Sequence, residues 1–205
     1  MFAAGVGTSM GSGIMLKYAS ETGENCLLDA VAGVATSFNH NLSAKAVDEV
    51  WPYLRIPGIA LRKIAQEALR MNVIHLKKWD DELVKRGVIL ENGQRVKTFY
   101  EFDDQITSKI CGYSGAQEYY AANSTHTEID KIKIPLFALS SLDDPIITPK
   151  GIPFEAFKAS ENAILMATTN GGHVGWFTGN LKVARWYPVP CIEFFEAIYQ
   201  KSKLS

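Results

Sequence analysis

The feature that most constrains the fold of this 205-residue chain lies near its start, where Gly7-Thr8-Ser9-Met10-Gly11 forms a G-x-S-x-G pattern. In this pattern a serine lies on a sharp turn between a strand and a helix, with its hydroxyl exposed above a sheet. The turn is expected to leave no room for side chains two residues either side of the serine, which accounts for the two glycines. Turns of small residues also produce the pattern by chance, so its weight depends on the segments around it.

The segments on both sides of Ser9 have the expected character. Residues 2–8 form an apolar run that predicts a strand, and residues 10–19 predict a helix that Gly23 ends. A second apolar run, Cys26–Ala35, has the length and composition of a strand buried on both faces. A strand, a helix and a buried strand in this order predict a βαβ unit, and therefore an α/β fold with a mostly parallel sheet flanked by helices.

The middle of the chain, about residues 37–130, departs from this alternation and predicts a helical, cap-like insertion. Ala44–Leu54 and Ile59–Leu76 have helical periodicity, and apolar residues recur every three or four positions within the second segment. The segment is too long for a simple crossover and is rich in aromatic residues. Core packing is the favoured explanation of its apolar stripe. The chain is thus expected to be one partial domain, residues 1–205, that carries this insertion.

Two further strands are predicted after the insertion, and each ends in residues that can carry chemistry. Ile134–Leu142 leads into Asp143 and Asp144, and Ala163–Thr169 leads into a Gly-Gly pair and His173. Because parallel strands end at one edge of a sheet, an acid and a histidine are expected beside Ser9. The helices expected in this half of the chain are Phe154–Ala159 and Cys191–Lys201, the second with Ile192, Phe195 and Ile198 on its buried face.

Ser9, Asp144 and His173 have the chemistry and the chain order of a nucleophile, an acid and a base. A serine hydroxyl is a weak nucleophile unless a base takes its proton, and His173 is the expected base. Asp144 is expected to orient the imidazole and to stabilise its protonated form. The backbone N–H of Met10 is expected to donate to an oxyanion, with a second donor from a loop after an earlier strand.

Each of these residues has a plainer interpretation. The less favoured interpretations are that Ser9 is an ordinary turn serine and that His173 is a loop histidine, and Asp143 is an alternative to Asp144. Asp144 is favoured because a short Pro-Ile-Ile turn follows it, which leaves Asp143 as a capping or solvated residue. The other three histidines, His40, His75 and His126, have no ligand-like spacing, so a metal site is not expected. No cofactor is expected either.

Composition excludes several classes of function. A net charge of −1 and a pI of about 6.4 give no indication of nucleic-acid binding. Three dispersed cysteines (Cys26, Cys111 and Cys191) without a CxxC pair are typical of buried or free thiols in a reducing compartment. The first residues are uncharged and continue into a strand, so no signal peptide is expected. No apolar run approaches the roughly 20 residues of a transmembrane helix.

At these residues the chain resembles the α/β-hydrolase superfamily, and specifically its YheT-like branch. That branch includes bacterial YheT hydrolases, animal abhydrolase-domain acylglycerol lipases and phospholipases, and fungal medium-chain fatty-acid ethyl ester synthase/esterases. The segments that carry the resemblance are GTSMGSGIMLKYASETGE, FDDQITSKICGYSGAQEYYAANS, KIKIPLFALSSLDDPI and TTNGGHVGWF. The resemblance implies a catalytic triad of Ser9, Asp144 and His173, and a lipid-like ester as substrate.

The resemblance also implies what this chain lacks. The turn around the serine of the G-x-S-x-G pattern is called the nucleophile elbow. Members of the family carry about half a domain before this elbow, including early strands and a His-Gly oxyanion loop, so this chain resembles the C-terminal half of the fold. Residues 2–8 are therefore expected to form an unpaired, apolar sheet edge that favours self-association. The location is left open: the cytoplasmic side, or a membrane if the full-length protein carries an N-terminal anchor.

Two functions remain open at this point. One is hydrolysis of carboxylic esters such as acylglycerols or fatty-acyl esters through an acyl-enzyme, with an alcohol in place of water giving ester synthesis. The aromatic pair Trp176-Phe177 suits an acyl chain, although core packing explains it equally. The other is a truncated, catalytically inactive remnant or interaction module. The acyl-chain length and the head group are not indicated.

Overall fold

The computed structural model describes residues 1–50, 85, 98–179 and 182–204. The chain divides into two compact units, one made of Met1–Ser43 with Asn123–Ser205 and the other of Ala44–Ala122. The predicted helix Ile59–Leu76 and its apolar stripe lie outside the described residues.

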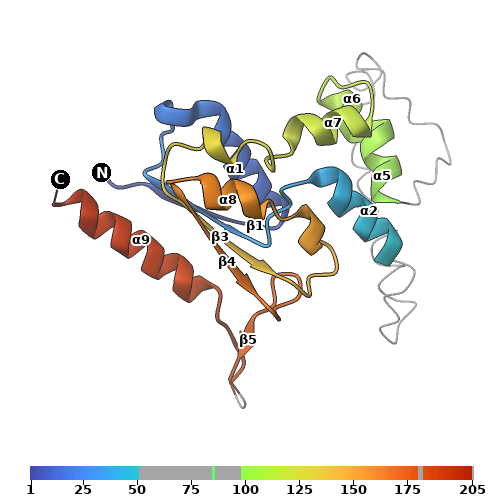
Figure 1. Ribbon diagram of the computed structural model, residues 1–205. Coiled ribbons are helices and arrows are strands. Elements are labelled where there is room, and N and C mark those ends of the chain that lie inside the picture. The colour runs from blue at the N-terminus through green and yellow to red at the C-terminus, as the bar shows by residue number, and fades with distance from the viewer. Residues whose placement is uncertain (51–84, 86–97, 180–181, 205) are drawn as a thin grey trace. The chain divides into compact units, whose positions relative to one another are not determined.

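The first unit is built on a four-stranded sheet in the order β1-β2-β3-β4 (Figure 1). All three strand pairs are parallel, as the sequence predicts. Its strands are β1 (Ala4–Thr8), β2 (Ala30–Val34), β3 (Leu136–Ser141) and β4 (Ala163–Thr168). Helix α1 (Met10–Thr22) connects β1 to β2, so the predicted βαβ unit is present. It ends at Gly23, which has a φ of 53° that favours glycine.

Helices cover both faces of the sheet. Alternate residues of a strand point to opposite faces, and here both sets of side chains are buried in a core. Val31 and Ala138 join a core with Leu16 of α1 and Phe157 of α8 (Phe154–Ala159). Ala32, Val34, Phe137 and Leu139 instead face α9 (Pro188–Ser202) across the second core. Figure 1 shows α1 and α8 on one side of the sheet and α9 on the other.

Two predicted elements differ from the structure at their limits. The run Cys26–Ala35 forms a strand only from Ala30, because Asp29 turns to the start of the chain: its N–H donates to the Ala3 carbonyl at 2.7 Å. Helix α9 begins at Pro188 rather than Cys191. The prediction that Ile192 lies on the buried face of this helix is wrong, because Ile192 is 55% exposed while its neighbour Cys191 is buried.

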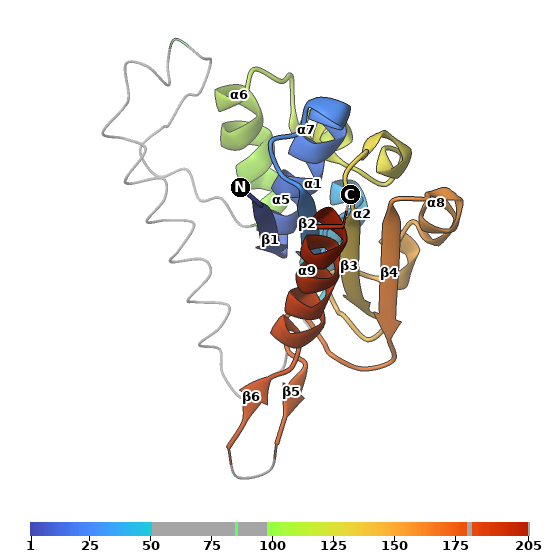
Figure 2. The ribbon, with the colours of Figure 1, turned by 90° about the vertical axis from the view of Figure 1, so that its left-hand side faces the viewer.

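A small hairpin that the sequence does not predict precedes α9. Strands β5 (Phe177–Thr178) and β6 (Ala184–Arg185) pair antiparallel, and Figure 2 shows them extending beyond the sheet before the chain enters α9. Each strand has only two residues, which is too short for an alternating pattern to be visible in the sequence.

The described part of the second unit is helical. Its elements are most of α2 (His40–Val50), α5 (Phe99–Phe102), one turn of π-helix (Asp103–Thr107), α6 (Ser108–Ile110) and most of α7 (Ala116–Asn123). Its tyrosines pack on one another, with the ring centroids of Tyr113 and Tyr119 5.6 Å apart. Tyr120 donates to the Asp103 carboxylate at 2.6 Å, and burial together with this bond raises the pKa of Tyr120. These aromatic residues therefore have a packing role. The insertion limits of about 37–130 stay a prediction.

Within the described residues, β1 pairs with β2 on one side and with no strand on the other. The side chain of Val6 on this strand is 54% exposed. An apolar edge strand with free N–H and C=O groups favours association with another chain. We therefore expect the 205-residue protein to be oligomeric or prone to aggregation in size-exclusion chromatography with light scattering.

Val6→Lys is expected to shift this protein toward the monomer, because a charge on an edge strand opposes pairing. Val183→Lys makes the same change at a comparably exposed valine beside β6, which pairs with β5 and not with β1, and is expected to leave the association unchanged. A wild-type monomer at high concentration would contradict the prediction.

Candidate active site

Ser9 lies between the end of β1 at Thr8 and the start of α1 at Met10. Its backbone has φ 52° and ψ −124°, a region that is strained for any residue other than glycine. Hydrogen bonds hold this turn: the Ser9 N–H donates to the Val34 carbonyl at 2.8 Å, and the Ser9 carbonyl accepts from the Ser12 hydroxyl at 2.6 Å. The strain is thus fixed by the sheet on one side and by the helix on the other.

The two glycines of the G-x-S-x-G pattern have different roles. A Cβ at Gly7 would lie 2.5 Å from the Ser12 Cα and 2.6 Å from the Gly11 carbonyl oxygen, so only glycine fits there. A Cβ at Gly11 would meet nothing within 4 Å. The expectation that the turn excludes side chains on both sides is therefore wrong at Gly11, because a Cβ added there would lie in open space.

Asp144 follows β3 and is almost completely buried, with 4% of its surface exposed. Its Oδ1 accepts from the N–H groups of Ile146 and Ile147 at 2.8 and 2.9 Å. Its other oxygen, Oδ2, lies 2.9 Å from Nδ1 of His173. The Pro-Ile-Ile turn of the sequence thus holds one carboxylate oxygen and leaves the other for the imidazole.

Asp143 makes a different set of contacts. Its Oδ1 accepts from the Gly172 N–H at 2.7 Å and from the Ser141 hydroxyl, with which it is in very close contact. The bond from Ser141, followed by the bond from Gly172, holds the pKa of Asp143 below its usual range. Of the two neighbouring aspartates, Asp144 is therefore the one that contacts the ring.

The hydrogen-bond chain reaches Ser9 through the other ring nitrogen. Nε2 of His173 lies 2.8 Å from the Ser9 hydroxyl oxygen, while Nδ1 lies 2.9 Å from Asp144. Met10 is the first residue of α1, so its N–H is among those without an acceptor inside the helix. The structure brings the three predicted side chains together at the ends of their strands. Their catalytic roles stay predictions.

The loop that carries His173 is tightly folded. Gly172, Val174 and Trp176 all have positive φ, at 57°, 59° and 45°. A Cβ at Gly171 would lie 2.5 Å from the Trp176 ring. That ring is 7% exposed and donates from Nε1 to the Thr168 hydroxyl at 2.9 Å. Of the two explanations left open for Trp176, core packing is thus the one that the structure supports.

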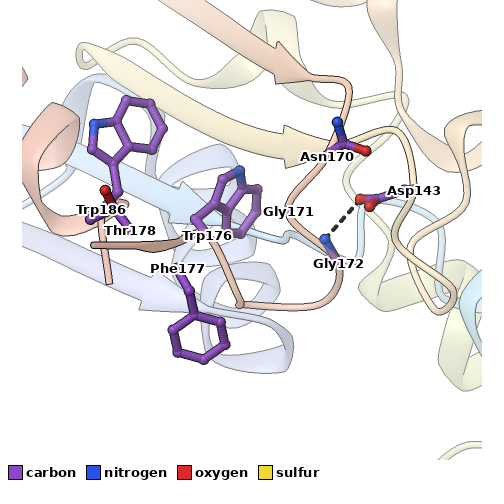
Figure 3. Close-up of a pocket in the computed structure, with 8 residues that line it drawn as sticks. All are labelled: Asp143, Asn170, Gly171, Gly172, Trp176, Phe177, Thr178 and Trp186. Atoms are coloured by element: carbon purple, nitrogen blue, oxygen red, sulfur yellow. Dashed lines mark hydrogen bonds between the residues drawn. The ribbon is translucent and has the colours of Figure 1, made fainter. Parts of the chain in front are cut away.

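A pocket of about 340 Å³ lies beside this loop (Figure 3). Its lining residues are Asp143, Asn170, Gly171, Gly172, Trp176, Phe177, Thr178 and Trp186. None of Ser9, Asp144 and His173 lines it. Figure 3 shows Asp143 bonded to Gly172 beside the pocket, so the pocket borders the backbone of the loop rather than the Ser9 hydroxyl.

Asp143 is exposed and accepts a backbone N–H, which agrees with the expectation of a capping or solvated residue, but the sequence interpretation did not identify Gly172 as its partner. The only sequence signal is its place between a strand end and Asp144, since its partner Gly172 is remote in the sequence. No cluster of three or more metal-ligating side chains occurs among the described residues. In the part of the chain that the structure describes, no helix is long and apolar enough to span a membrane.

The pattern of the alpha/beta hydrolase fold family matches residues 4–179. The chain is 29% identical to a monoacylglycerol lipase of Saccharomyces cerevisiae over 96% of its own length. It is 30% identical to an abhydrolase domain-containing protein of Dictyostelium discoideum over 84% of its length. A medium-chain fatty acid ethyl ester synthase/esterase 2 of S. cerevisiae is 23% identical over 93%.

The chain spans less than half the length of these relatives, at 42%, 42% and 44%. The family match nevertheless covers most of the chain, from the elbow strand to the loop after His173. The parallel sheet flanked by helices agrees with it. The chain therefore belongs to the alpha/beta hydrolase fold family.

Proposed function

We propose that this protein is a serine hydrolase of carboxylic esters, with Ser9 as nucleophile, His173 as general base and Asp144 as the residue that orients the imidazole. The observation that carries the proposal is the continuous hydrogen-bond chain from Ser9 through both nitrogens of His173 to Asp144, at 2.8 and 2.9 Å. A nucleophile within hydrogen-bond reach of a base that a third group orients is the arrangement that serine catalysis requires.

In the proposed reaction, the Ser9 oxygen attacks the ester carbonyl carbon while Nε2 of His173 takes the hydroxyl proton. The Asp144 carboxylate stabilises the protonated imidazole, and the Met10 N–H donates to the oxyanion. When the tetrahedral intermediate collapses, the C–O bond to the alcohol breaks and His173 returns its proton to that alcohol. Water then attacks the acyl-enzyme in the same way and releases the acid. An alcohol in place of water yields a new ester.

A lipid-like ester is the proposed substrate class. Met10 and Ile14 lie one helical turn apart in α1, directly after Ser9, and are 66% and 64% exposed. They give the helix that follows the nucleophile an apolar surface suited to an acyl chain. Two of the relatives, a monoacylglycerol lipase and a medium-chain fatty acid ethyl ester synthase/esterase, support the same class by their names. A non-catalytic interaction module is not favoured, because such a role has no need of the hydrogen-bond chain.

The proposal is tested by labelling the 205-residue protein with a fluorophosphonate probe and mapping the adduct by mass spectrometry. The adduct is expected on the peptide that contains Ser9, because only an activated serine hydroxyl attacks the probe. Labelling is expected to disappear in Ser9→Ala and to persist in Ser202→Ala, a matched change at the exposed end of α9. Absence of an adduct on Ser9 in the wild-type protein would reject the proposed function.

A further inference from the structure

The two neighbouring aspartates after β3 contact two neighbouring residues of the loop after β4. Asp144 contacts the ring of His173 at 2.9 Å, and Asp143 accepts from the backbone N–H of Gly172 at 2.7 Å. One contact holds the side chain of the proposed base, and the other holds the peptide that immediately precedes it. Figure 3 shows the second contact at the rim of the pocket.

The backbone of this loop is strained, so it needs contacts that hold it in place. Val174 and Trp176 both have positive φ, which costs free energy for side chains that are branched or bulky. Such a backbone persists only where surrounding contacts fix it. Two of these contacts lie within the loop itself, where the N–H groups of Gly175 and Trp176 both donate to the Gly171 carbonyl at 3.1 Å. The bond from Gly172 to Asp143 instead connects the loop to another strand end.

Asp143 is itself held in place. The Ser141 hydroxyl, at the last residue of β3, donates to the same Oδ1 atom that accepts from Gly172. The two bonds favour the ionised form of this exposed carboxyl group, which holds its pKa below the usual range. A charged acceptor makes the bond from the Gly172 N–H shorter and stronger than a neutral one would. The contact thus joins the end of β3 to the loop after β4 through one oxygen atom.

We infer that Asp143 is a positioning residue, which holds the Gly172 peptide so that His173 reaches both Ser9 and Asp144. The inference rests on the proposed function for its kinetic test. Asp143 does not contact the reacting atoms; it acts through the backbone of the loop. Displacing a catalytic group by about 1 Å costs on the order of 10²-fold in rate, so a backbone anchor one residue away has a measurable effect.

The test compares three variants of the 205-residue protein on a p-nitrophenyl ester. Asp143→Ala is expected to lower kcat about 10- to 100-fold with KM within about 2-fold, because the base is displaced while substrate contacts remain. Asp143→Asn is expected to recover most of kcat, since its amide oxygen still accepts from the Gly172 N–H. A merely structural role predicts instead that kcat follows the loss of thermal stability.

Glu128→Ala is the matched control for stability. The Glu128 carboxylate accepts from Lys17 at 2.8 Å, from Ser20 at 2.9 Å and from Lys131 at 3.1 Å, and none of these three partners belongs to the His173 loop. This variant is expected to lower the unfolding temperature and to leave kcat and KM of the folded protein unchanged. The inference is overturned if Asp143→Ala keeps kcat within about 2-fold of wild type, or if Glu128→Ala lowers kcat equally.

An NMR measurement separates failure of this inference from failure of the proposed function. If the wild-type protein neither labels at Ser9 nor turns over ester, the proposed function fails, and the position of His173 is read from its Nδ1 proton. That resonance is expected to shift or disappear in Asp143→Ala and to be retained in Asp143→Asn and Glu128→Ala. An unchanged resonance in Asp143→Ala overturns the inference whatever the activity of the wild type.

Discussion

Asp144→Asn is expected to lower kcat by about 10⁴-fold with little effect on the fold. The cause lies in the two oxygen positions of this side chain. Oδ1 accepts from the N–H groups of Ile146 and Ile147, so in the variant the amide oxygen takes that position. The amide NH₂ group then faces Nδ1 of His173, where the carboxylate oxygen Oδ2 lies in the wild type.

An NH₂ group at that position forces Nδ1 to accept a hydrogen bond. The imidazole proton then lies on Nε2, the nitrogen 2.8 Å from the Ser9 hydroxyl, and His173 can no longer take the proton of Ser9. The variant keeps the hydrogen bonds of the turn, so its free energy of unfolding is expected to change by about 1 kcal/mol. For a chain of this size that corresponds to about 2–4 °C in unfolding temperature.

The measurement is kcat on a p-nitrophenyl ester together with a thermal unfolding curve. Asp143→Asn removes one negative charge at the adjacent residue and keeps its acceptor for Gly172, so it serves as the matched control with only a small loss of kcat. If Asp144→Asn kept kcat within about tenfold of wild type, the role of Asp144 as the residue that orients the imidazole would be refuted.

The parts of the site that could be predicted are those that local sequence patterns carry. The elbow around Ser9 and the two strand ends before Asp144 and His173 each occupy a few consecutive residues. The rule that parallel strands end at one edge then brings them together, without knowledge of any contact between them. The choice of Asp144 over Asp143 also rested on a local feature, the turn that follows it, and the hydrogen bonds to Ile146 and Ile147 explain that preference.

What could not be predicted depends on contacts between remote parts of the chain. The bond from Gly172 to Asp143 joins the ends of two strands, and an acidic residue after a strand gives no sign of it in the sequence. Strand β2 begins at Ala30 because of a bond between Asp29 and Ala3, whereas the apolar run starts at Cys26. Ile192 has helical spacing with Phe195, but the sheet covers a different side of α9. Periodicity gives the existence of an element, and tertiary packing decides its limits and its buried face.

The glycines of the elbow allow a sharper test of what its pattern requires. Gly7→Ala is expected to destabilise the protein by about 3 kcal/mol. The added Cβ would lie 2.5 Å from the Ser12 Cα and 2.6 Å from both the Ser12 nitrogen and the Gly11 oxygen. All three are backbone atoms of α1, so relief requires the helix to move away from β1. The expected fall in unfolding temperature is about 6–12 °C, and the Ser9 hydroxyl moves with the helix.

Gly11→Ala is the matched control, since it adds the same methyl group four residues later in the same motif. Its Cβ would meet nothing within 4 Å, and the residue lies in α1, where alanine is favoured over glycine. We expect this variant to be more stable than the wild type by about 0.5 kcal/mol and to label with the fluorophosphonate probe as before. Thermal unfolding of both variants decides the matter. If Gly11→Ala cost as much as Gly7→Ala, the turn would be closed on both sides, and the asymmetry between the two glycines would be wrong.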